Sequence, residues 1–109
     1  MKNYFFSFVI PTYNRSHFLK KTISSLLNQK YKHFEIIIID DGSTDSTRQI
    51  IDEINDPKIR YFFQKNQERG VARNMGFLKA KGDYVNFFDS DDIAYDNHLQ
   101  TANNILQKS

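Results

Sequence analysis

The sequence predicts an α/β domain with an open, mostly parallel sheet and helices on both faces. Short apolar segments alternate with longer segments whose apolar residues recur at helical spacing, which gives the order βαβαβαβα. Four consecutive isoleucines, Ile36 to Ile39, are typical of a strand buried on both faces of a parallel sheet. Polar residues directly follow three of the four predicted strands, at the edge where such sheets bind ligands.

The predicted strands are short segments rich in aromatic and β-branched residues. They cover residues 6–10, 34–39, 59–63 and 84–88. Pro11 is expected to end the first strand because proline has no backbone N–H to donate to a neighbouring strand. Asn55, Asp56 and Pro57 are expected to separate the second helix from the third strand.

The first two predicted helices follow the first two strands. The first carries apolar residues at helical spacing, at positions 18, 19, 23, 26 and 27. Either Asn14 or Ser16 is expected to be its N-cap, since both residue types accept hydrogen bonds from the first N–H groups of a helix. The second carries isoleucines at positions 50, 51 and 54, and the turn over residues 42–45 places its start near Ser43.

The last two predicted helices flank the fourth strand. The third covers residues 70–81, and Gly82 is expected to terminate it. The fourth covers residues 97–108, with apolar residues at positions 99, 102, 105 and 106. The chain of residues 1–109 is therefore predicted to be one domain or part of one.

Composition and charge exclude several classes of protein. With 15 basic and 13 acidic residues, the chain lacks the strong basic bias of a nucleic-acid-binding domain. It has no cysteine, which excludes disulfides and thiolate metal sites and is compatible with the cytoplasm. No apolar run approaches the roughly 20 residues that span a bilayer, and the first residues lead straight into a strand. Neither a membrane span nor a signal peptide is predicted.

Three aspartates, Asp89, Asp91 and Asp92, stand within four residues directly after the fourth strand. Two carboxylates about 6 Å apart repel by roughly 3 kcal/mol at an effective dielectric constant near 20, so such a cluster favours a bound cation. Oxygen ligands suit Mg²⁺ or Mn²⁺, which leave other positions to water and substrate phosphates. The alternative is a turn of solvated aspartates that binds nothing. The strand that leads into the cluster favours the metal site.

A second acidic pair, Asp40 and Asp41, ends the second strand. Both residues fit a cap of the following helix. Asp41, at the end of the strand, is the better candidate to accept a hydrogen bond from a base or a ribose.

Arg73, in the third helix, has two interpretations: an exposed arginine paired with a nearby acid, or a bidentate ligand of a phosphate.

Four segments together resemble the family 2 glycosyltransferases of the GT-A fold, which is Rossmann-like. They are residues 8–15 (FVIPTYNR), 35–45 (EIIIIDDGSTD), 70–76 (GVARNMG) and 82–92 (GDYVNFFDSDD). The segments occur in the order found in the family, and the similarity covers the chain from about residue 5 to about residue 100. The resemblance implies the N-terminal, nucleotide-sugar-binding part of a glycosyltransferase.

The resemblance implies a role for each residue of a nucleotide site and a metal site. The nucleotide-binding residues are Pro11, Thr12, Tyr13, Asn14, Arg15, Asp41, Arg73, Asp89 and Ser90, and the metal ligands are Asp91 and Asp92. By this resemblance Thr12 and Tyr13 flank the base, Asp41 accepts a hydrogen bond from uracil, and Asp89 lies near the ribose. Which of Asp91 and Asp92 coordinates the metal stays open, and the expected cofactor is Mn²⁺ or Mg²⁺.

The implied reaction is metal-dependent transfer, with inversion, of a sugar from a nucleotide-diphosphate donor to an acceptor hydroxyl. The donor is expected to be a UDP-sugar. In the family the carboxylate base lies well downstream of the metal motif, whereas this sequence stops one helix later, at Ser109. No catalytic residue is therefore assigned. The chain is expected to be a donor-binding half, truncated before the acceptor-binding half, that transfers sugar poorly by itself.

The implied partners are a nucleotide-sugar donor and a saccharide or lipid-linked acceptor, as in the synthesis of cell-envelope polysaccharide. The expected location is the cytoplasm; the sequence leaves open a peripheral contact with the inner face of the membrane and the oligomeric state.

Three other functions compete with this interpretation. The main alternative is a non-catalytic nucleotide- or metal-binding module. A phosphotransferase of the haloacid dehalogenase type would place its Asp-x-Asp motif after the first strand, and a response-regulator receiver would require a lysine after a late strand. Neither pattern matches this chain.

Overall fold

The computed structural model describes residues 3–65 and 69–108, in which strands and helices alternate. The elements are β1 (Phe6–Thr12), α1 (Ser16–Leu27), β2 (Phe34–Asp41), α2 (Thr47–Ile54), β3 (Ile59–Gln64), α3 (Arg69–Lys79), β4 (Tyr84–Phe87) and α4 (His98–Gln107). The predicted order of elements is confirmed.

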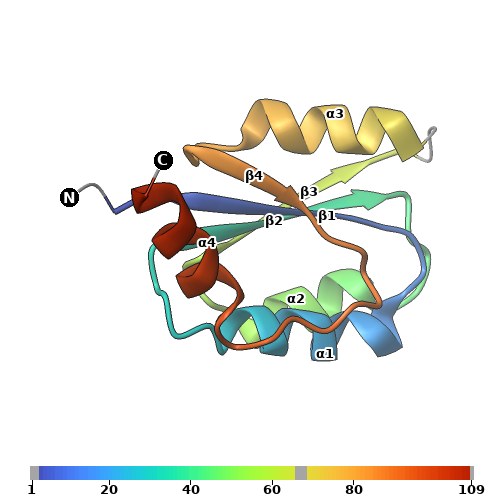
Figure 1. Cartoon of the computed structure of the whole chain (residues 1–109). Coiled ribbons are helices and arrows are strands. Elements are labelled where there is room, and N and C mark those ends of the chain that lie inside the picture. Colours follow the sequence, from blue (N-terminus) through green and yellow to red (C-terminus); the bar gives the residue numbers. More distant parts are fainter. Residues whose placement is uncertain (1–2, 66–68, 109) are drawn as a thin grey trace.

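The four strands form one parallel sheet in the order β3-β2-β1-β4. Helix α3 covers one face, and α1, α2 and α4 lie on the other (Figure 1). The chain continues from β1 to β2 on one side, and later returns to β4 on the other side of β1. The strand order therefore reverses between β1 and β4. Open α/β sheets bind ligands outside the carboxyl ends of their strands at such a reversal.

Strand β2 lies at the centre of the core, and all eight of its residues are buried. Its side chains alternate between two apolar layers, because successive residues of a strand point to opposite faces. Ile36 and Ile38 belong to the layer that contains Leu19 of α1, whereas Ile37 and Ile39 belong to the layer with Ala72 of α3. The prediction that the isoleucine run is buried on both faces is confirmed.

Pro11 does not end β1, contrary to the prediction: the strand continues to Thr12 and stays paired with β2. The Val9 carbonyl accepts a hydrogen bond from Phe88 N–H on the β4 side (2.9 Å). Residues two apart in a strand direct their backbone groups to the same side, so Pro11 faces the side where β4 has already ended, at Phe87. Its missing N–H therefore costs no bond in the sheet, and the strand carries Thr12 to the carboxyl edge.

Neither predicted cap stabilises the start of α1. The N-cap position is Arg15, which makes no side-chain cap hydrogen bond, and Ser16 N–H donates to Asp45 Oδ2 from the β2–α2 loop (3.1 Å). Asn14 has a left-handed backbone (φ 50°), and its Oδ1 accepts a hydrogen bond from Thr44 N–H (2.8 Å). A carboxylate and an amide thus join two loops that border the carboxyl edge of the sheet.

Helix α2 begins at Thr47, later than the predicted start near Ser43. Asp45 Oδ1 accepts a hydrogen bond from Thr47 N–H (3.1 Å), so a single carboxylate serves the first turns of α1 and α2. Burial disfavours the charged form of Asp45, but the hydrogen bonds from Thr47 and Ser16 outweigh it and lower the pKa of this carboxyl group.

Helix α3 ends at Lys79, and Gly82 does not terminate it as predicted. Among the described glycines only Gly42 has a positive φ (86°). A Cβ on Gly82 would lie 2.6 Å from Ser7 Oγ and 2.7 Å from the Ser7 backbone nitrogen. Glycine is therefore required here by the close approach of the α3–β4 turn to β1.

The helices are short. The longest in the described ranges is α1, with 12 residues, whereas a helix needs about 20 apolar residues to span a bilayer. Accordingly, the part of the chain that the structure describes contains no helix long and apolar enough to cross a membrane.

Candidate nucleotide and metal site

A pocket of about 380 Å³ opens at the carboxyl edge of the sheet, beside the reversal between β1 and β4. Small-molecule sites typically measure about 300–1,000 Å³. Its lining comprises Pro11, Thr12, Tyr13, Arg15, Asp41, Ala72, Asp89, Ser90 and Asp91. These residues come from the ends of β1 and β2, from the loops that follow β1 and β4, and from α3. Most of the residues predicted for the two sites therefore share a single pocket.

The end of β1 contributes a buried hydroxyl and an exposed ring. Thr12 is only 3% exposed, and within the described part of the chain its Oγ1 has no hydrogen-bond partner. A buried, unpaired polar atom costs about 1–3 kcal/mol unless something satisfies it. Tyr13, the next residue, is 46% exposed. The register pairs Thr12 with Asp40, so the Thr12 hydroxyl lies on the Asp40 face of the sheet, whereas Tyr13 offers the pocket an aromatic face.

Asp40 and Asp41 have different surroundings because they point to opposite faces of β2. The Asp40 carboxylate is buried and accepts hydrogen bonds from Ser43 N–H (2.9 Å) and from the Tyr61 hydroxyl. Asp40 therefore stabilises the turn after β2. Asp41 lines the pocket, and its Oδ1 accepts a hydrogen bond from Gln64 Nε2 (2.9 Å).

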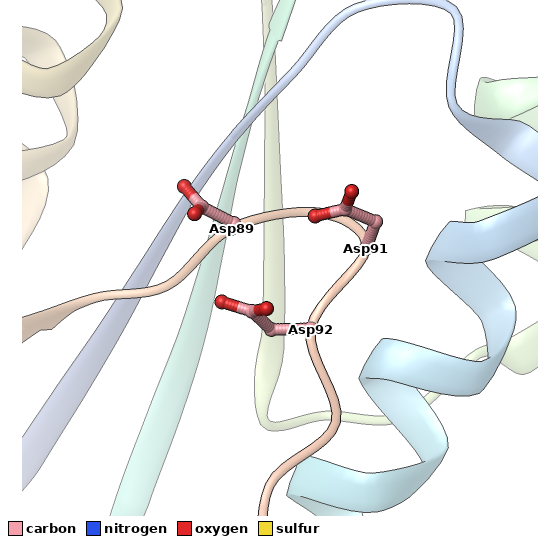
Figure 2. A group of neighbouring side chains, drawn as sticks. All are labelled: Asp89, Asp91 and Asp92. Atoms are coloured by element: carbon pink, nitrogen blue, oxygen red, sulfur yellow. The ribbon is translucent and has the colours of Figure 1, made fainter.

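The three aspartates of the acidic loop, residues 89–92, bring their carboxylates together. One oxygen from each of Asp89, Asp91 and Asp92 lies within 4.8 Å of the other two, and all three residues are exposed. Figure 2 shows them on one curved loop, with the carboxyl groups of Asp91 and Asp92 directed toward that of Asp89. The loop is attached to α1, because Thr22 Oγ1 donates a hydrogen bond to the Ser90 carbonyl (3.0 Å).

This cluster fits an oxygen-bound divalent cation. Mg²⁺ binds oxygen at about 2.0–2.1 Å, so two ligands of one ion lie at most about 4.2 Å apart. The present spacing is close to that limit, and exposed side chains reach it by small rotations. The donors are all carboxylate oxygens, which suit Mg²⁺ or Mn²⁺. Asp91 and Asp92 would hold the ion, next to Asp89.

Three predicted residues lie outside the pocket lining. Asn14 uses its side chain to join two loops, as described above. Arg73 is exposed on α3, and its guanidinium carbon lies 5.8 Å from the centre of the Phe87 ring. Asp92 belongs to the acidic cluster at the pocket mouth. The roles predicted for these residues stay predictions.

Two residues at the site were not predicted from the sequence. Ala72 is buried and lines the pocket from α3, where its small side chain leaves room for a ligand. Gln64 lies at the end of β3 and donates to Asp41. The rule that polar residues after parallel strands face a ligand applies to Gln64 as well. The sequence predicts a third strand that ends at Phe63, and no functional residue is predicted after it.

A comparison with protein families identifies the group to which this architecture belongs. The model of the glycosyl transferase family 2 matches residues 7–108. The chain belongs to glycosyl transferase family 2. The resemblance and the fold predicted from the sequence are both confirmed by this match and by the parallel sheet.

Relatives and solved structures agree with the family. The chain is 43% identical over 103 residues to an uncharacterized glycosyltransferase of Haemophilus influenzae, covering 92% of this chain and 41% of that protein. It matches the crystal structure of S. aureus TarS 1–349 in complex with UDP-GlcNAc with a TM-score of 0.91 and 31% identity, over 95% of this chain and 31% of that one.

A more distant match shows the fold alone. It is the mannosyltransferase PcManGT from Pyrobaculum calidifontis, in complex with GDP-Man and Mn²⁺, with a TM-score of 0.83 and 20% identity over 95% of this chain and 32% of that one. This chain spans less than half the length of each of these proteins.

Proposed function

We propose that the pocket binds the nucleoside-diphosphate part of a sugar donor, and that the acidic loop holds Mg²⁺ or Mn²⁺ beside the diphosphate. The observation that carries the proposal is that Asp89 and Asp91, two of the three residues with converging carboxylates, line the same pocket as Asp41. Membership of glycosyl transferase family 2 supports it.

The proposed base is uracil. Its N3–H is a hydrogen-bond donor, so a carboxylate acceptor complements it. Asp41 supplies this acceptor from the pocket lining. Tyr13 supplies a half-exposed ring that can stack on the base. The likeness to TarS, whose structure holds UDP-GlcNAc, supports a uridine donor.

The diphosphate is proposed to lie between the base site and the acidic loop. Asp89 and Ser90 line the pocket on that side, and Arg15 supplies a positive charge from the start of α1. Arg73 is proposed to approach the same group from α3. A metal ion bound there neutralises charge on the diphosphate as the sugar leaves.

The complete reaction is proposed to be transfer of the sugar, with inversion, to a hydroxyl of a saccharide or of a lipid-linked acceptor. Deprotonating that hydroxyl requires a base, and no residue among positions 3–65 and 69–108 is assigned this role. A lipid-linked acceptor would bring the protein to a membrane surface, as expected from the family resemblance.

Calorimetric titration of the chain with UDP, with and without Mn²⁺, tests the proposal. We expect Mn²⁺ to strengthen UDP binding by at least about tenfold, because metal and diphosphate bind side by side. GDP is the control, and it should bind more weakly. Equal UDP affinity with and without Mn²⁺ would remove the metal site from the proposal. Equal affinity for GDP would remove the uracil assignment, and no binding of either nucleotide would favour a structural module.

A further inference from the structure

Gln64 and Asp41 are direct neighbours across the β2–β3 pair. The register places Asp41 opposite Gln64, and both side chains are more than 90% buried. Gln64 Nε2 donates a hydrogen bond to Asp41 Oδ1 (2.9 Å). We propose that Gln64 is a positioning residue that fixes the Asp41 carboxylate for recognition of the nucleotide base. This inference rests on the proposed function.

The hydrogen bonds of the Gln64 amide point to this role. A carboxylate only accepts hydrogen bonds, so the NH₂ group of Gln64 must face Asp41. The Oε1 atom is then buried and has no hydrogen-bond partner in the described ranges. An unpaired buried amide oxygen lowers stability, and buried polar atoms are rarely left in this state. Within the described residues, the Gln64 amide therefore uses only its NH₂ group, and that group binds Asp41.

Gln29 shows how a structural glutamine is used in the same chain. It is completely buried, its Nε2 donates to the Tyr95 carbonyl, and its Oε1 accepts a hydrogen bond from Leu99 N–H (3.0 Å). Both ends of its amide are satisfied, and they fasten the first turn of α4 and the segment before it to the core. Gln64 differs from Gln29 because its one bond goes to a residue of the pocket.

The position of Asp41 explains why it needs support. It is the last residue of β2, and the next residue, Gly42, turns the chain with a φ of 86°. Recognition of a base requires the carboxylate oxygens in one orientation, and an ordered side chain binds more tightly because less entropy is lost.

Tyr61 provides a matched control on the same pair of strands. Its hydroxyl donates a hydrogen bond to Asp40, so it also joins β3 to a carboxylate of β2. Neither Tyr61 nor Asp40 lines the pocket. Tyr61→Phe therefore removes a comparable hydrogen bond between the same strands without touching the base site.

The experiment measures UDP affinity by calorimetry in the presence of Mn²⁺ and affinity for Mn²⁺ alone by electron paramagnetic resonance. For Gln64→Leu we expect UDP to bind roughly tenfold more weakly and Mn²⁺ to bind as in the unaltered chain. For Gln64→Glu, which has the same size but places a second acceptor beside Asp41, the loss of UDP affinity should be larger. Tyr61→Phe should leave both affinities within about twofold of the unaltered chain.

Normal UDP binding by folded Gln64→Leu would overturn the inference, as would equal losses in Gln64→Leu and Tyr61→Phe. A measurement without substitutions covers the case in which the variants do not fold. On addition of UDP with Mg²⁺, the side-chain NH₂ resonances of Gln64 should shift while those of Gln29 stay in place; unchanged Gln64 resonances would contradict the proposal. If the unaltered chain binds no UDP, the proposed function fails together with this inference.

Discussion

Carboxylates at the two ends of the sheet have opposite surroundings. At the amino end, Glu35 is buried, and its carboxylate accepts hydrogen bonds from Ser7 Oγ (2.6 Å), Arg60 Nη1 (2.9 Å) and Lys81 N–H (2.7 Å). At the carboxyl end, the acidic loop exposes three aspartates. No lysine or arginine of the described residues forms an ion pair with Asp91 or Asp92.

The difference separates a carboxylate that stabilises the fold from those that we propose bind a metal ion. Glu35 connects β1, β3 and the α3–β4 turn, and thereby fixes the start of β4. The acidic loop lies at the other end of the same strand, where three exposed carboxylates repel one another. A substitution of Glu35 should therefore lower stability and leave metal binding unchanged. A substitution in the acidic loop should weaken metal binding and leave stability unchanged or higher.

The largest expected effect follows from Glu35→Leu. This change leaves Arg60 and the Lys81 N–H without their carboxylate partner and should lower the free energy of unfolding by about 2–3 kcal/mol. For a domain of this size, the midpoint of thermal unfolding should fall by about 10 °C, measured by circular dichroism. Affinity for Mn²⁺ below that temperature should be unchanged. A loss of Mn²⁺ affinity without a loss of stability would contradict the structural role of Glu35.

Asp91→Asn should weaken metal binding without lowering stability. Removing a proposed ligand should weaken Mn²⁺ binding by at least about tenfold. The stability of the metal-free chain should not fall, because the change relieves repulsion among the carboxylates. Asp96→Asn is the matched control, since Asp96 is an exposed aspartate close by in sequence whose carboxylate makes a long contact with Lys30 Nζ (3.9 Å). Equal Mn²⁺ affinity in the two variants would show that Asp91 is not a ligand.

The smallest effect is the dependence of stability on pH. Burial raises the pKa of Glu35, but hydrogen bonds from Ser7, Lys81 and Arg60 outweigh it, and the pKa is lowered from the ordinary value of 4.5. A lowered folded-state pKa stabilises the fold above that ordinary value, and this contribution is lost as the pH falls below it. In chemical denaturation between pH 6 and pH 3, Glu35→Gln should lose less stability than the unaltered chain. Parallel curves would contradict this role of Glu35.

The sequence predicts the fold well because hydrophobic periodicity is a local property. The isoleucine run and the helical stripes identify every element in order, and the parallel sheet follows from their alternation. The errors concern contacts between residues distant in sequence. Pro11 stays in β1 because β4 is short, Asp45 from another loop serves Ser16, and Gly82 is required by the backbone of Ser7.

The candidate site shows the same division. The rule that ligands bind after parallel strands places Thr12, Asp41 and Asp89 together, and the structure brings them to one pocket. Asp40 and Asp41 are distinguished only by the face of β2 on which each lies, which depends on the register of the sheet. The contribution of Gln64 depends on the pairing of β2 with β3, and no local pattern in the sequence reveals it.

The most direct test of the central claim, that the acidic loop and Asp41 form one nucleotide–metal site, is a crystal structure of the chain with UDP and Mn²⁺. The anomalous signal of manganese locates the ion directly. We predict manganese on Asp91 or Asp92, bridging to the diphosphate, with the uracil ring against Asp41 and Thr12. Manganese at another part of the surface, or UDP bound away from Asp41, would contradict the claim.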